Sequence, residues 1–315
     1  MIKQILGKTG PEVTVLGYSM WFMLMKETWR IHDDIAMLKA IQTATESGIN
    51  WFDTAPVYGF GHAESLLARG ISHMPRESLI LSTKFGIDWQ NNNHFRFALR
   101  PSDIRTELEN SLQRLETDYI DIYQPYIIPP NIALDEIWGE LDRLKQEGKI
   151  RHIGAANFDI LQARTSRTLS SLQSIQLPYS LSFRDIQEEL LPYCAEHKIG
   201  VIAYSPVLLY YLLIKLGLEK SKTNHNLIRS MFTHNEDPST SISLNKRIEP
   251  IAKKRGISIS QLTIAWILCF KEISSVLVTA KNVKQLNSLI DAIDISLDRD
   301  EMAVIGEHIA ETVGI

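Results

Sequence analysis

The chain has 315 residues, and 33 Lys and Arg against 37 Asp and Glu give it a formal net charge of −4. With 44% hydrophobic and 22% charged residues, it has the composition of an ordinary globular protein, and the lack of a basic excess argues against a nucleic-acid partner. Its two cysteines, Cys194 and Cys269, are too few for a disulfide scaffold, so we expect a reducing, cytoplasmic compartment.

Short runs rich in β-branched residues alternate with longer amphipathic segments along most of the chain. The predicted strands are Thr14 to Gly17, Asn50 to Asp53, Leu79 to Thr83, Tyr119 to Tyr123, His152 to Gly154, Ser174 to Leu177, Gly200 to Tyr204 and Ser275 to Val278. The predicted helices include Asp33 to Ser47, Pro101 to Glu116, Leu134 to Glu147, Phe183 to His197 and Lys246 to Arg255. Eight such repeats favour an α/β fold, a (β/α)₈ TIM barrel, and one domain over residues 1–315.

The region around the first strand favours this barrel over a doubly wound sheet. A doubly wound sheet normally has a Gly-rich turn after its first strand, and here that position reads Leu16-Gly17-Tyr18-Ser19-Met20. Earlier in the chain, Ile2 to Ile5 and Val13 to Leu16 flank Gly7-Lys8-Thr9-Gly10. This pattern predicts an N-terminal β-hairpin that closes the bottom of the barrel.

A long irregular region follows the seventh strand. Residues 207–243 are predicted to form a loop insertion over the barrel mouth, because Glu219 to Ser243 is rich in Ser, Thr, Asn and His. The most apolar part, Val207 to Leu218, is about 12 residues long and contains Lys215, whereas roughly 20 apolar residues are needed to span a bilayer. We therefore expect no membrane partner.

Three polar residues fall at the carboxyl ends of two neighbouring strands, where barrel enzymes carry their active sites. Asp53 and Tyr58 follow the second strand, and Lys84 follows the third. A phenol has a pKa near ~10, and an adjacent ammonium favours the phenolate and brings this pKa toward the working range. Alone, each residue has an ordinary structural interpretation. Together they predict a Tyr that protonates a carbonyl oxygen while hydride reaches the carbonyl carbon.

The sequence resembles the aldo-keto reductase superfamily over most of its length. The motifs that carry the resemblance, in family order, are Ile5 to Gly10, Asp53 to Ala55, Tyr58 to Glu64, Ser82 to Lys84, Asp118 to Gln124, Gly148 to Gly154, Asn157-Phe158 and Ala203 to Pro206. The resemblance implies a (β/α)₈ barrel that binds an extended NADP(H) and reduces carbonyls of small molecules without a metal. It further implies Tyr58 as general acid, Lys84 and Asp53 as its tuning pair, Asn157 and Gln176 as carboxamide ligands, and Tyr204 as the ring stacked on nicotinamide.

The substrate side departs from the family pattern. Tyr126 stands where the family usually has a His that donates to the substrate oxygen, and Ile127 stands where a Trp is common. Losing one aimed donor from an oxyanion site typically costs about 10²–10³ in rate, so simple aldehyde reduction is in doubt. Tyr126 itself is a candidate catalytic donor, and Trp21, Trp89 and Ile127 are expected to wall the substrate pocket.

The cofactor side departs as well. Ala156 replaces a Ser, the bulky residues Val207 to Tyr211 follow Ser205, and Ser288-Leu289 replace the Glu-Asn pair that reads adenine. Residues kept for the cofactor are Ser205, Lys281, which suits a ribose 2′-phosphate, and Gln285. Lys281 and Lys284 could equally be solvated surface charges.

Three functions are consistent with these residues. The first is an NADP(H)-dependent oxidoreductase acting on a specialised ketone, a sugar derivative or an activated alkene, with Tyr58 as the acid. The second is a proton-transfer enzyme, an isomerase or lyase, that uses Asp53, Tyr58 and Lys84 without net redox chemistry. The third is a barrel that binds a dinucleotide or another ligand without turnover, although this leaves the grouping of three such residues unexplained.

Overall fold

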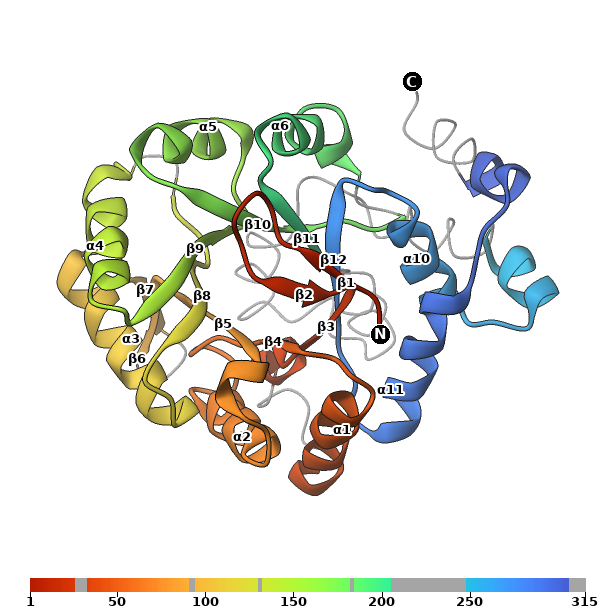
Figure 1. Ribbon diagram of the computed structural model, residues 1–315, viewed down its shortest axis with the longest axis horizontal. Coiled ribbons are helices and arrows are strands. Elements are labelled where there is room, and N and C mark those ends of the chain that lie inside the picture. The colour runs from red at the N-terminus through yellow and green to blue at the C-terminus, as the bar shows by residue number, and fades with distance from the viewer. Residues whose placement is uncertain (26–32, 91–93, 130–131, 182–183, 205–247, 306–315) are drawn as a thin grey trace.

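The computed structural model describes residues 1–25, 33–90, 94–129, 132–181, 184–204 and 248–305. Parallel strands close into a barrel in the order β3-β4-β5-β8-β9-β10-β11-β12, with helices arranged around it (Figure 1). The barrel strands are β3 Leu16–Ser19, β4 Trp51–Asp53, β5 Ile80–Phe85, β8 Ile120–Pro125, β9 Ile150–Ala156, β10 Leu172–Pro178, β11 Gly200–Tyr204 and β12 Ile273–Val278. The predicted (β/α)₈ TIM barrel is therefore confirmed.

The helices pack their apolar faces on the outside of the barrel. Their bounds are α1 Asp34–Glu46, α2 His62–Ile71, α3 Pro101–Leu115, α4 Asp135–Gln146, α5 Ile160–Leu169, α6 Leu190–His197, α10 Ile259–Leu268 and α11 Val283–Ile290, with further helical turns at 248–255 and 299–305. Short 3₁₀ helices are η1 Trp21–Met25, η2 Arg76–Ser78, η3 Asp185–Gln187 and η5 Asp291–Asp294. On α3 the helical stripe is buried, as its spacing predicts, at Ile104, Leu108, Leu112 and Leu115.

The N-terminal hairpin exists, but the strand after it begins later than predicted. Strands β1 Lys3–Ile5 and β2 Glu12–Thr14 pair antiparallel, so Thr14 belongs to the hairpin and the barrel strand β3 starts only at Leu16. The prediction of a strand over Thr14 to Gly17 is wrong in its bounds. The hairpin strand β2 and the barrel strand β3 follow each other closely and have similar residue patterns, so the sequence does not show where one ends and the other begins. The turn packs on the amino end of β11, where a Cβ added to Gly200 would lie 2.5 Å from Leu6.

The single helix predicted over Phe183 to His197 is also wrong. The described part contains the short η3 and then α6, which begins at Leu190. Pro192 explains the break, because it has no N–H to donate and its ring would clash with the carbonyl of Glu188 in a continuous helix. Proline is tolerated in the first turn of a helix, and that is where α6 places it.

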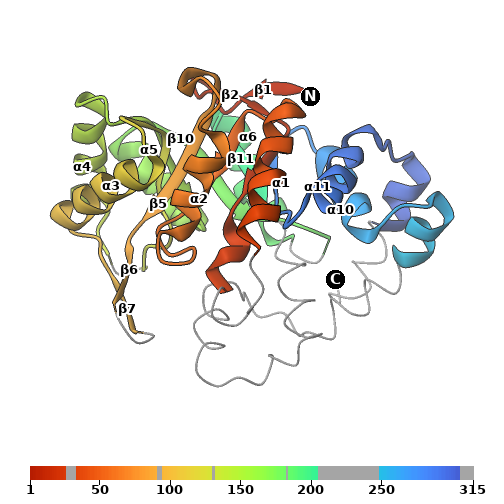
Figure 2. The ribbon, with the colours of Figure 1, turned by 90° about the horizontal axis from the view of Figure 1, so that it is seen from below.

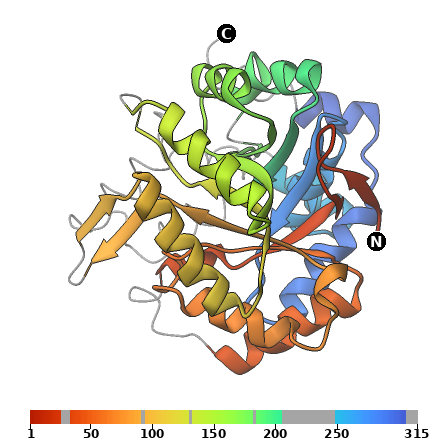
Figure 3. The same cartoon turned by 60° about the vertical axis from the view of Figure 1, so that its left-hand side comes forward.

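A second hairpin projects from the opposite end of the barrel to β1 and β2 (Figure 2). It consists of β6 Ile87–Gln90 and β7 His94–Phe97, and in Figure 3 it is the gold pair of strands that extends away from the barrel. It follows β5 directly, so it lies at the carboxyl end of that strand. The backbone of Trp89 is in this hairpin.

Two further expectations concern the region after β11 and the membrane. The loop insertion predicted over 207–243, with the apolar stretch Val207 to Leu218, lies outside the described residues. Within the described ranges, no helix combines the length and the apolar character needed to cross a membrane.

Candidate active site

The centre of the site is a buried ion pair between neighbouring strands. Asp53 ends β4 and Lys84 lies on β5, and their exposed fractions are 0% and 1%. The Lys84 Nζ donates to both carboxylate oxygens of Asp53, at 2.7 and 2.8 Å, and to the carbonyl oxygen of Thr54 at 3.1 Å. The ammonium is thus held by acceptors on the strand beside it, as the sequence predicts for this pair.

Two serines and a glutamine complete the surroundings of Asp53, and none of them was assigned a role from the sequence. Ser19 and Ser82 donate to its two carboxylate oxygens at 2.9 and 2.8 Å, and Gln124 Nε2 lies 3.5 Å from Oδ1. The strand register explains this grouping, because Ser19, Asp53 and Ser82 pair in sequence across β3, β4 and β5. Strand periodicity could have identified Ser82, which lies two residues before Lys84 on the same face.

Tyr58 reaches this pair from the turn after β4. Its amide donates to the Ala55 carbonyl at 3.0 Å, and Gly59, Phe60 and Gly61 follow with positive φ angles of 61°, 56° and 85°. This left-handed run turns the chain sharply into α2, and an exposed Phe in that conformation is unusual.

The ring of Tyr58 meets the ring of Tyr126 edge-on, with centroids 6.2 Å apart. Lys84 Nζ lies 5.2 Å from the Tyr58 ring centre and 5.7 Å from the Tyr126 ring centre. Both hydroxyls are buried and interact with each other, although their contact lies outside normal hydrogen-bond geometry. The Tyr58 hydroxyl makes no hydrogen bond to the Lys84 ammonium, although the two groups are neighbours. Two hydroxyl groups remain available to an oxygen atom that enters the site.

The predicted direction of the Tyr58 pKa shift is wrong. Burial raises the pKa of Tyr58 well above its usual 10, and the neighbouring Tyr126 and Asp53 raise it further. Burial likewise lowers the pKa of Lys84, an effect that Asp53 opposes. Burial and the negative charge of Asp53 together outweigh the attraction of the ammonium for a phenolate. Tyr58 is consequently a neutral phenol at ordinary pH.

A second buried carboxylate ties the Tyr58 loop to the strand that carries Lys84. Glu64 on α2 accepts from Thr83 Oγ1 at 2.7 Å and from Arg114 Nε at 2.5 Å. A Cβ added to Gly61 would lie 2.6 Å from the Arg114 side chain, so glycine lets α3 pack closely on this loop. Glu64 therefore holds α2, which follows the Tyr58 loop, against β5 and α3.

The amides predicted to bind a carboxamide lie on the other side of the barrel mouth. Asn157 follows β9 and Gln176 lies on β10 beside it. Asn157 Oδ1 accepts from the Tyr204 hydroxyl at 2.7 Å, and Gln176 Oε1 accepts from Gln124 Nε2 at 2.8 Å. Gln124 thus connects this pair to Asp53.

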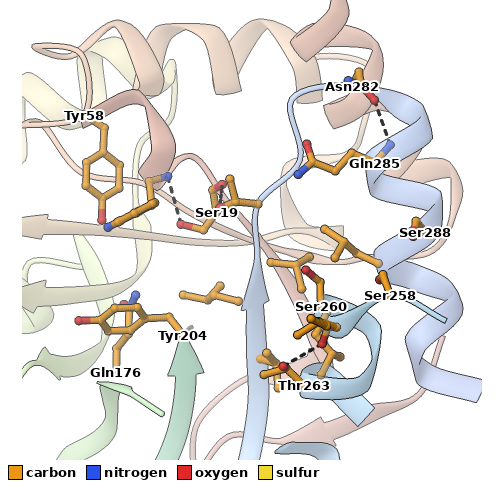
Figure 4. A pocket seen from close by; sticks show the side chains of 18 of the residues that line it. Ser19, Tyr58, Gln176, Tyr204, Ser258, Ser260, Thr263, Asn282, Gln285 and Ser288 are labelled. Atoms are coloured by element: carbon orange, nitrogen blue, oxygen red, sulfur yellow. Dashed lines mark hydrogen bonds between the residues drawn. The ribbon is translucent and has the colours of Figure 1, made fainter. Parts of the chain in front are cut away.

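A cavity of about 520 Å³ begins at these groups and extends along β12 to the amino ends of α10 and α11 (Figure 4). Tyr58 and Tyr204 lie at one end, and the other end holds Ser258, Ser260, Asn282, Gln285 and Ser288. Ser258 and Asn282 are the N-caps of α10 and α11. The shape is that of a site for an extended ligand, with polar groups at both ends and apolar walls between them.

The structure brings most of the predicted residues to this cavity. Those that line it are Trp21, Tyr58, Tyr126, Asn157, Gln176, Tyr204 and Gln285, while Asp53 and Lys84 lie behind Tyr58. Among the described residues of the lining, the cation is Lys284 and not Lys281, and Ile127 is absent. Ser205 and the side chain of Trp89 lie outside the part of the chain that is described.

A barrel with such a cavity at its mouth has the architecture of an enzyme, and comparison with known proteins identifies the family. The family model for the aldo/keto reductase family matches residues 22–310. The chain is 33% identical over 314 residues to the aldo-keto reductase YhdN of Bacillus subtilis (strain 168), covering 97% of this chain and 92% of the relative. It is 31% identical over 334 residues to the NADH-specific methylglyoxal reductase of Escherichia coli (strain K12), covering 99% of each.

Solved structures agree with these relatives. The glycerol dehydrogenase AKR11B4 from Gluconobacter oxydans matches with a TM-score of 0.80 and 29% identity, covering 98% of this chain and 95% of that one. The chain belongs to the aldo/keto reductase family and is an oxidoreductase of that family.

Proposed function

We propose that this oxidoreductase transfers hydride from NADPH to a ketone, a sugar derivative or an activated alkene, with Tyr58 as the proton donor. The observation that carries the proposal is the buried hydroxyl of Tyr58, which lies beside the Tyr126 hydroxyl at one end of an elongated cavity and makes no hydrogen bond of normal geometry there. A buried donor without a partner is costly unless a ligand completes it. A small molecule with a carbonyl oxygen would complete this donor. We also propose that the protein is located in the cytoplasm.

The residues present fit a nicotinamide dinucleotide. Asn157 and Gln176 offer amides for the carboxamide, Tyr204 offers an aromatic face, and the amino ends of α10 and α11 suit anionic groups at the far end. When bound, this cofactor supplies the hydride. Ala156 stands where the family usually has a Ser hydroxyl. The amides of Asn157 and Gln176 would therefore recognise the nicotinamide without that hydroxyl.

Tyr58 and Tyr126 would share the work on the substrate oxygen. Both are neutral donors, so they can hydrogen-bond a carbonyl oxygen and stabilise the charge that develops on it. The proton then passes from the Tyr58 hydroxyl to that oxygen, a favourable step because an alkoxide is more basic than a phenolate. Lys84, held by Asp53, lies near both rings and offsets the negative charge left on Tyr58.

We propose that the cofactor carries a 2′-phosphate, and that Lys284 binds it in place of the predicted Lys281. Among the described residues that line the cavity there is no Asp or Glu, and Lys284 lies next to the N-cap of α11. A cation at a helix amino end is a favourable site for phosphate. The relative from Escherichia coli is named as NADH-specific, so the two cofactors must be compared directly.

The test is a titration of the purified protein with NADPH and with NADH, followed by cofactor fluorescence. We expect NADPH to bind at least about tenfold more tightly, since a charge-assisted phosphate contact contributes roughly 1.5–3 kcal/mol. A panel of aldehydes, ketones and enones is then added to the NADPH complex. Tighter binding of NADH would contradict the 2′-phosphate assignment, and absence of binding by either nucleotide would contradict the proposed function.

The second candidate is a proton-transfer enzyme on the same barrel. It is favoured by the occupied oxygens of Asn157 and Gln176, which already accept hydrogen bonds from the protein itself. An enzyme of this kind would show turnover of an enolisable ketone with no consumption of nucleotide, so the same titration distinguishes the two candidates.

A further inference from the structure

The orientation of the Gln176 amide is determined by a chain of contacts that begins at Asp53 and passes through Gln124. Gln124 Nε2 faces Asp53 Oδ1 at 3.5 Å and donates to Gln176 Oε1 at 2.8 Å. An ionised carboxylate only accepts hydrogen bonds, so Gln124 must direct its nitrogen toward Asp53. Gln176 must then direct its oxygen toward Gln124, which leaves its N–H groups as the donors available to a ligand.

The orientation of the Asn157 amide is fixed in the same way by a backbone carbonyl. Asn157 Nδ2 donates to the carbonyl oxygen of Tyr126 at 3.1 Å. The amide oxygen therefore points away from that carbonyl, and it accepts from the Tyr204 hydroxyl at 2.7 Å. Tyr204 ends β11 and Asn157 follows β9, so the ring reaches across β10 to make this bond. Both amide oxygens are thus engaged by donors of the protein.

A nicotinamide carboxamide presents one carbonyl oxygen and one amino group. The carbonyl oxygen can accept from the N–H groups of Gln176, but the two amide oxygens that could accept from the amino group each already accept one hydrogen bond from the protein. We propose, on the basis of the function proposed above, that the Tyr204 hydroxyl competes with the carboxamide amino group for Asn157 Oδ1. Tyr204 then has two opposing effects on the cofactor, because its ring supports the nicotinamide while its hydroxyl opposes the carboxamide.

The competition makes a distinct energetic prediction. In the wild-type protein the amino group replaces one hydrogen bond with another of similar strength, so the exchange contributes little to affinity. In Tyr204→Phe the aromatic ring remains, and before binding Asn157 Oδ1 no longer accepts from a protein hydroxyl. The amino group then displaces only water from this oxygen and no longer competes with a protein donor, so the affinity for the cofactor rises.

The experiment measures dissociation constants by calorimetry for NADP⁺ and for its 3-acetylpyridine analogue, in which a methyl group replaces the carboxamide amino group. We expect Tyr204→Phe to bind NADP⁺ about three- to tenfold more tightly than the wild type does, and the analogue with unchanged affinity. Tyr179→Phe is the matched control. It removes a buried hydroxyl that accepts from Gln187 Nε2 at 2.8 Å outside the cavity lining, and it should alter neither constant.

A measurement on the wild-type protein alone tests the same point without any variant. If the amino group only exchanges with Tyr204, the wild type should bind NADP⁺ and the analogue with dissociation constants within about threefold of each other. A strong wild-type preference for NADP⁺, or equal weakening of both nucleotides in Tyr204→Phe, would overturn the competition and leave the proposed function intact. Binding of neither nucleotide by the wild type would overturn both.

Discussion

Replacing Tyr58 with Phe is expected to lower kcat for carbonyl reduction by about 10²–10⁴-fold, with the dissociation constant for NADPH nearly unchanged. The hydroxyl that is lost is the buried donor at the end of the cavity, and it makes no hydrogen bond of normal geometry that would hold the fold. Single-turnover oxidation of bound NADPH measures the chemical step directly. Because burial raises the pKa of Tyr58, the neutral acid persists above pH 10, and the wild-type rate should not fall on account of Tyr58 below that value.

Tyr123→Phe provides the control for this substitution. Tyr123 is equally buried, and its hydroxyl donates to the carbonyl oxygen of Ile104 at 3.1 Å, away from the cavity lining. Its loss should cost some stability and leave kcat within about threefold. A Tyr58→Phe enzyme that keeps the rate of Tyr123→Phe would show that Tyr58 is not the proton donor.

Replacing Lys84 with Met is expected to lower the free energy of unfolding by about 3–5 kcal/mol. The substitution leaves Asp53 as a carboxylate with no exposed surface and without its cation, although Ser19 and Ser82 still donate to it. Urea unfolding followed by circular dichroism gives the value. We also expect loss of turnover, because the charge that stabilises the Tyr58 phenolate is removed.

Two comparisons show whether the loss comes from the unpaired charge. The double variant Asp53→Asn, Lys84→Met has no buried charge and should be more stable than Lys84→Met alone. Lys149→Met removes a partly exposed cation that pairs with Glu109 and Glu147, and it should cost only about 0–1 kcal/mol. If Lys84→Met lowered the free energy of unfolding by no more than Lys149→Met does, Asp53 and Lys84 would not form the buried ion pair described above.

The fold was predictable because each barrel strand is a short β-branched run followed by a helical stripe of a different period. The predicted bounds were wrong where one sequence pattern is compatible with two different local structures. Thr14 alternates with its neighbours whether it ends a hairpin or begins a barrel strand, and only the pairing with Lys3 decides between them. The break before Leu190 could have been anticipated from Pro192, whose chemistry forbids the continuous helix.

The chemical groups of the site were predictable, and their electrostatics were not. Residue type and position at strand ends bring Asp53, Tyr58 and Lys84 together, but the sign of the Tyr58 pKa shift depends on how much water the fold excludes. The hydrogen bond between Tyr204 and Asn157 spans three strands, so no local pattern reveals it.

The hydride itself provides the most direct test of the proposed chemistry. The protein is mixed with NADPH carrying deuterium at both C4 positions of the nicotinamide, and a panel of ketones and enones is searched by mass spectrometry for labelled product. We expect one deuterium on the carbon that was reduced, and a Tyr58→Phe protein that transfers it far more slowly. Conversion of any member of the panel by the wild-type protein with no deuterium in the product would contradict hydride transfer and favour a proton-transfer enzyme.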